Sequence, residues 1–181
     1  EEGKERINEF VYSVLNLIIT FTSTMSIIII VFSRQILKIT TGFADAQRFE
    51  TANNLLKITA FYFLFIALSG VVSSLLNNYK KFAVAASMGI VFNLTIIIGT
   101  IILGKKMGIY GLGISYLLSG VLQLAIMLPD FFKIMKTYKF TFNLNDKYVV
   151  EMFKLMVPTL IGIFGYQINE IIDNRFATKL S

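Results

Sequence analysis

Six polar side chains lie in the second half of the last apolar segment, and they are the residues of this chain best suited to chemistry. In chain order they are Gln167, Asn169, Glu170, Asp173, Asn174 and Arg175. At helical spacing Glu170 and Asp173 share one face, because residues three or four positions apart are neighbours on a helix. An acid inside a membrane is costly and normally faces a water-filled cavity or a cation. The alternative is that the helix ends near Gln167 and that the acids lie among solvated headgroups.

The composition is that of an integral membrane protein. Of the 181 residues, 55% are hydrophobic and only 15% are charged, and the mean hydropathy is +0.70. A soluble domain of this size needs more charge to cover its surface. The formal net charge of +6 suits contact with anionic lipid headgroups. Nucleic acid is not an expected partner, because the basic residues lie between apolar runs and form no basic stripe.

The absence of Cys and His from the sequence excludes several kinds of chemistry. Disulfides, thiolate nucleophiles, Cys/His zinc sites and histidine proton relays all need one of these residues. A membrane enzyme acting on polyprenyl phosphates usually needs clustered carboxylates for a metal ion or a His base. Here only Glu170 and Asp173 approach each other, so we expect neither an enzyme nor a cofactor. A structural membrane module, in which polar residues only hold helices together, is a further alternative.

The apolar runs predict an all-α, polytopic transmembrane helix bundle with five membrane spans and additional interfacial amphipathic helices. The spans are predicted at residues 10–33, 58–79, 82–104, 107–128 and 155–174. Each is about long enough to cross a hydrocarbon core of roughly 30 Å at about 1.5 Å per residue. The five spans form part of one transmembrane domain over residues 1–181. Because the chain opens at Glu1 without Met, we expect it to be a piece of a longer protein.

Two longer polar segments connect the spans. Between residues 34 and 57 an amphipathic helix is predicted, with Asp45 as its N-cap, and it is expected to lie at the membrane surface. Between residues 131 and 154, Lys133, Lys136 and Lys139 recur at every third position, which is typical of a basic helix on an anionic, cytoplasmic membrane surface. The fourth span is expected to end at Pro129, and Pro158 is expected to bend the fifth.

Four stretches of the sequence resemble, in order and spacing, the MurJ (MviN) family of lipid II flippases in the MOP superfamily of exporters. They are TGFADAQRFETANNLLKIT, SSLLNNYKKFAVAASMGIVFNLTIIIG, GVLQLAIMLPDFFK and VPTLIGIFGYQINEIIDNRFATKLS. The resemblance implies a partial MOP/MATE-like flippase fold, with this chain as helices three to seven of fourteen in the N-terminal lobe. It also implies a multi-pass protein of the bacterial cytoplasmic membrane that moves lipid II to the outer leaflet by alternating access.

The resemblance places part of the functional site on the last span. The family pattern Q-I-N-x-x-x-D matches Gln167, Asn169 and Asp173. It implies that Asp173 is a candidate for binding the coupling ion, Na⁺ or H⁺. The other polar residues of this span are candidates for the substrate cavity, namely Gln167, Asn169, Glu170, Asn174 and Arg175, and the last three are candidates from their place on the helix and not from the family pattern. The family's principal pyrophosphate-binding residues fall outside this chain. The implied partners are lipid II, membrane lipids and the remaining helices of the transporter.

Other exporters of the same superfamily remain alternatives at this point. One alternative is a flippase of other lipid-linked oligosaccharides, and another is a drug/cation antiporter. These proteins share the fold and differ in the lining of the central cavity. Several Arg residues in the remaining helices would favour a pyrophosphate substrate, whereas apolar and acidic walls would favour cationic drugs.

Overall fold

A computed structural model describes residues 2–43, 45–135, 140–141 and 146–180 of the chain. The described residues form seven helices and contain no strand, which confirms the all-α prediction. The helices are α1 (Glu2–Val31), α2 (Ser33–Thr40), α3 (Ala46–Ala60), α4 (Tyr62–Asn78), α5 (Phe82–Met107), α6 (Ile109–Ile134) and α7 (Lys147–Leu180). Within the described part of the chain, five helical segments are long and apolar enough to cross a membrane, as predicted.

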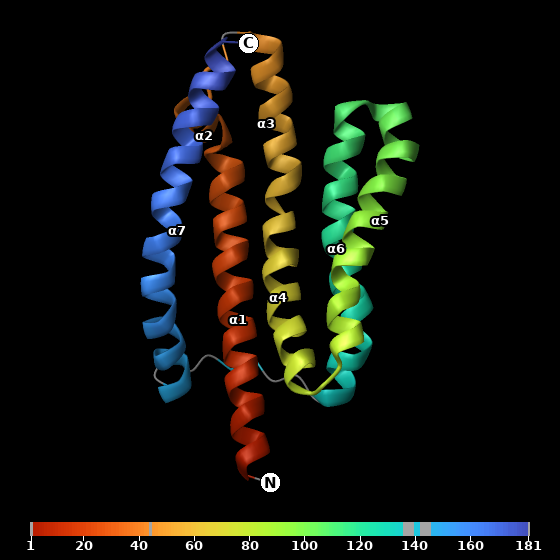
Figure 1. The fold of residues 1–181 in the computed structure, drawn as a ribbon, viewed down its shortest axis with the longest axis vertical. Coiled ribbons are helices and arrows are strands. Elements are labelled where there is room, and N and C mark those ends of the chain that lie inside the picture. Colours follow the sequence, from red (N-terminus) through yellow and green to blue (C-terminus); the bar gives the residue numbers. More distant parts are fainter. Residues whose placement is uncertain (1, 44, 136–139, 142–145, 181) are drawn as a thin grey trace.

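The long helices lie roughly side by side along the long axis of the molecule (Figure 1). In this view α7 lies beside α1, the α3–α4 rod follows, and α5 and α6 form a hairpin on the opposite side. The N-terminus lies at one end of the bundle and the C-terminus at the other, near α2. We call the end with α2 and the C-terminus the α2 end, and the opposite end the core end.

The amphipathic helix predicted in the first connector forms, with an unexpected direction. Asp45 is its N-cap, as predicted, because its Oδ1 accepts a hydrogen bond of 2.9 Å from the backbone N–H of Gln47. Only Phe61 separates the end of α3 from the start of α4, and the two helices form one rod in Figure 1. Residues 46–78 therefore make one helical segment that is long and apolar enough to cross a membrane, and α3 continues in the direction of α4 instead of lying at an angle to it.

Glycines bring α5 and α6 into close contact. Gly108, with φ of 58°, turns the chain between the two helices, a backbone conformation that glycine adopts without steric cost. A Cβ atom on Gly111 would lie 2.7 Å from the backbone N of Gly104 and would also meet the carbonyl of Leu103. Helices in lipid associate through close packing of small residues, and this contact is an example of such packing between α5 and α6.

The buried core lies at the core end, where α1, α4, α5 and the last turns of α6 converge. Leu76 and Met127 have no exposed surface, and Phe131 and Met135 are also buried. The expectation that the fourth span ends at Pro129 is therefore wrong, since α6 continues through Pro129 to Ile134. The turn after the proline stays helical because Phe131 and the following Met135 are anchored in the core, and this packing offsets the missing backbone donor.

Candidate functional site on the last helix

The helix α7 is continuous from Lys147 to Leu180. The alternative in which the helix ends near Gln167 is therefore wrong. Asp146 caps the helix start, because its Oδ1 accepts a hydrogen bond of 2.8 Å from the N–H of Tyr148. Lys136 and Lys139 of the predicted basic helix lie outside the described residues. Pro158 lies inside α7 without dividing it, and the bend expected there stays a prediction.

All six polar candidates lie on this one helix, and all of their side chains are exposed. They are Gln167, Asn169, Glu170, Asp173, Asn174 and Arg175. On a continuous helix Glu170 and Asp173 lie one turn apart on the same face, as expected. Among the described residues no third acid, His or Cys joins them. A cation at Asp173 would therefore take its remaining ligands from amide or backbone oxygens, or from parts of the longer protein.

Arg175 reaches a neighbouring helix. Its Nη1 donates a hydrogen bond of 3.2 Å to the backbone carbonyl oxygen of Ile39, in the last turn of α2. The last carbonyls of a helix lack intrahelical donors and carry partial negative charge, so a guanidinium is favourable at this position. The sequence marks Arg175 as a polar residue of α7, but nothing in it indicates α2 as the partner.

Two side chains of α1 hold the chain between α6 and α7, at Met135 and at Thr141. The hydroxyl of Tyr12 donates to the carbonyl of Met135 over 2.9 Å, and Nδ2 of Asn16 donates to the carbonyl of Thr141 over 2.8 Å. Both side chains come from α1 and are buried. The apolar pattern of α1 indicates that Asn16 needs a partner in the membrane, yet sequence reasoning did not single out this residue as a tether.

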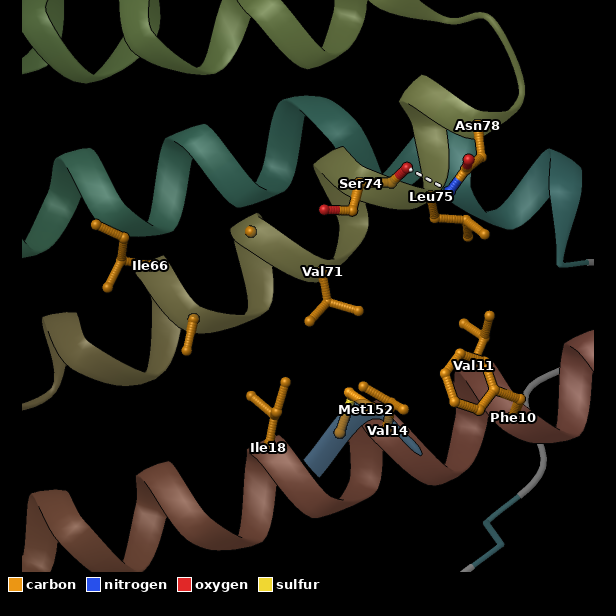
Figure 2. Close-up of a pocket in the computed structure, with 12 residues that line it drawn as sticks. Phe10, Val11, Val14, Ile18, Ile66, Val71, Ser74, Leu75, Asn78 and Met152 are labelled. Atoms are coloured by element: carbon orange, nitrogen blue, oxygen red, sulfur yellow. Dashed lines mark hydrogen bonds between the residues drawn. The ribbon is translucent and has the colours of Figure 1, made fainter. Parts of the chain in front are cut away.

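A groove of about 600 Å³ runs between α1 and α4. Figure 2 shows Val14 and Ile18 of α1 opposite Ile66 and Val71 of α4, with Met152 of α7 beside them. The lining is mainly apolar, and its polar residues lie at one end, where Nδ2 of Asn78 donates to the carbonyl of Ser74 over 3.2 Å. The groove lacks charged lining residues, so it does not offer a phosphate or cation site by itself.

The chain was compared with known proteins. A family model described as "Lipid II flippase MurJ" matches residues 1–181. A protein named "Probable lipid II flippase MurJ" from Buchnera aphidicola subsp. Schizaphis graminum is 31% identical over 183 residues, which cover 99% of this chain and 36% of that protein. A protein of the same name from Buchnera aphidicola subsp. Acyrthosiphon pisum is 29% identical, over 100% of this chain and 36% of the relative.

A third relative gives the same result over a shorter region. The "Probable lipid II flippase MurJ" of Haemophilus influenzae is 31% identical over 138 residues, which cover 75% of this chain and 27% of that protein. This chain thus spans little more than a third of the length of the two Buchnera relatives, at 36% of each. Because the family model covers every residue, the chain belongs to the MurJ family of lipid II flippases.

Proposed function

We propose that the longer protein to which these residues belong moves lipid II, or a closely related undecaprenyl-pyrophosphate-linked precursor, from the inner to the outer leaflet of the bacterial cytoplasmic membrane. These 181 residues then form part of its N-terminal lobe, and the remaining helices supply the principal substrate site. The observation that carries the proposal is the family match over the full chain. The names of the relatives support it, and they favour a lipid II flippase over the other exporters of the superfamily.

The physical requirements of flipping agree with the features of α7. The polar head of an amphiphile must cross a low-dielectric slab that strongly resists charge, so a hydrated cavity is needed. A helix that is apolar from Leu155 to Phe164 and polar from Gln167 to Arg175 suits the wall of such a cavity. Its exposed polar side chains leave room for contacts with substrate, water and helices of the longer protein.

We assign Asp173 as the residue that binds the coupling ion, Na⁺ or H⁺. A carboxylate that faces a cavity is neutralised by a cation in one conformation and releases it in another, so the ion biases the equilibrium between the two. Asp173 is exposed on α7, and Glu170 lies on the same face one turn away. The second carboxylate strengthens the local negative potential and favours a cation at this position.

The substrate is tested in cells depleted of their own flippase. The full-length protein is expressed there, and lipid II on the outer leaflet is measured by its accessibility to an external probe. Restored exposure is the expected result. A protein that is well expressed and correctly inserted, yet leaves lipid II inside, would refute the substrate and favour another exporter of the superfamily.

The coupling ion is tested with Asp173→Asn in the same full-length protein. We expect transport by the variant to lose its dependence on the Na⁺ or H⁺ gradient, because the amide cannot be charged. Glu151→Gln is the matched control, since it neutralises another exposed acid of α7, near the start of the helix. Unchanged ion dependence in Asp173→Asn would remove Asp173 from this role without affecting the lipid II proposal.

A further inference from the structure

The contacts of α7 are unequal along its length. Near its start, the ring of Tyr148 packs edge-on against Phe10 of α1 with 6.1 Å between centroids, and Val149 is only 1% exposed. Of the two buried α1 side chains described above, Asn16 holds Thr141 in the segment that precedes α7, whereas Tyr12 holds Met135 at the end of α6. Buried polar contacts of this kind are costly to break, because the freed groups would lie in an apolar environment. The base of α7 is therefore firmly attached.

Beyond the base, α7 runs alongside α1 (Figure 1) with little of its surface covered by the rest of the chain. Every described side chain from Phe153 to Ala177 is exposed. The Arg175 to Ile39 hydrogen bond at the α2 end joins two exposed residues. Such a bond contributes little, because water competes for both partners. Among the described residues, the polar end of α7 is thus held more weakly than its base.

The α2 side of this contact is itself fixed. Nη2 of Arg34, at the start of α2, forms an ion pair of 2.7 Å with Oε1 of Glu50 on α3, but both side chains are exposed and the pair adds little. Burial of two side chains holds α2 more firmly. Leu37 and Ser33 of α2 are buried. The short helix therefore presents its C-terminal carbonyls from a stable position, and the last turn of a helix attracts a cation.

We propose that Arg175 and the C-terminal turn of α2 form a latch. The latch holds the polar end of α7 against α2 in one conformation of the protein and releases it in another, while the base of α7 stays attached to α1. Arg175 acts here as a positioning residue that sets where Asp173 and Glu170 lie. This inference does not depend on which lipid or ion the longer protein uses.

The test measures distances at both ends of α7 in the full-length protein, reconstituted in lipid nanodiscs. One pair of spin labels is placed on exposed Gln35 of α2 and Ala177 of α7, and a second pair on Glu9 of α1 and Glu151 of α7. In Arg175→Gln we expect the population with the longer α2–α7 distance to rise about threefold to tenfold, as befits one hydrogen bond. The distance at the base is expected to stay unchanged.

Two further variants decide between a latch and a loss of packing. Arg175→Lys keeps a cationic donor and is expected to retain most of the short α2–α7 distance. Lys38→Gln is the matched control, because it removes an exposed cation from the same turn of α2 and should change neither distance. The proposal is overturned if Arg175→Gln leaves the distribution of α2–α7 distances unchanged. It is also overturned if the α2–α7 and α1–α7 distances both become longer. Because the readout is a distance, neither result depends on lipid II transport.

Discussion

The helices α6 and α7 differ in how much of their apolar surface the rest of the chain covers. Both are long, continuous helices with an internal proline, at Pro129 and Pro158. In the most apolar 18-residue stretch of α6, 39% of the residues are buried within the chain, whereas in the corresponding stretch of α7 only 6% are buried. In lipid, apolar surface alone does not drive helices together, and small residues and shape decide which of them pack. Within these residues, α6 therefore holds the bundle together, whereas most of the surface of α7 remains uncovered by the rest of the chain.

Equal substitutions at glycines of the two helices give the largest expected contrast. A Cβ on Gly111 of α6 meets the backbone of α5, which cannot move aside without separating the helices, whereas a Cβ on Gly162 of α7 has nothing within 4 Å. We expect Gly111→Ala to lower the free energy of unfolding by about 3 kcal/mol, as severe overpacking does. Gly162→Ala should be neutral or slightly stabilising, because Ala favours the helix.

The measurement is unfolding of the full-length protein in mixed micelles of increasing denaturing detergent. Correct insertion of both variants, checked by expression and accessibility, is the control. If Gly162→Ala lowered the free energy of unfolding as much as Gly111→Ala, the predicted difference between the two helices would be wrong. It would mean that helices of the longer protein pack against α7 as tightly as α5 packs against α6.

A pair of methionines tests the same contrast through cavities. Met127 of α6 has no exposed surface, whereas Met156 of α7 is 42% exposed. Met127→Ala leaves a cavity between α1, α4 and α6, and we expect it to cost about 2 kcal/mol of unfolding free energy. Met156→Ala should cost less than about 0.5 kcal/mol, as is usual at a surface. The same detergent titration measures both, and equal losses would refute the difference in packing.

The sequence predicted the elements of this fold better than their contacts. The length and hydropathy of the apolar runs were enough to predict the five spans, and the residue type of Asp45 was enough to predict the helix cap. Both features depend on residues that are close together in the sequence. The path of α6 beyond Pro129 was missed, since it depends on Phe131 and Met135 reaching a core built by other helices. The direction of α3 was missed for the same reason.

Hydroxyl groups in α1 illustrate this limit within a single helix. Hydroxyls inside a helix often bond to the carbonyl one turn earlier, and Thr22 and Thr24 do so, donating to the carbonyls of Ile18 and Thr20.

Ser26 lies two residues further along α1 and behaves differently. It donates over 2.8 Å to the carbonyl of Ala60, where α3 gives way to α4. Like the two threonines, Ser26 lies among apolar residues of α1. The hydroxyl of Ser26 differs only in that a carbonyl of a neighbouring helix is within its reach. The polar face of α7 was predictable from spacing, whereas its neighbour α2 was not, because no local pattern encodes a contact 136 positions away in the sequence.

A pair of aspartates gives the smallest expected contrast and tests whether the charge on α7 has a structural role. Asp130 of α6 is 18% exposed, and its Oδ1 lies 3.6 Å from the Nζ atoms of both Lys81 and Lys133. Asp173 of α7 is exposed and forms no ion pair within the described part of the chain.

Asp130→Asn should cost about 0.5 to 1 kcal/mol of unfolding free energy, and high salt should shrink this cost, because salt screens such pairs. Asp173→Asn should leave stability within about 0.5 kcal/mol of the parent, as expected of a carboxylate whose role is to bind an ion. A clear loss of stability there, measured without Na⁺ and at neutral pH, would instead identify Asp173 as one half of a structural ion pair with another part of the longer protein.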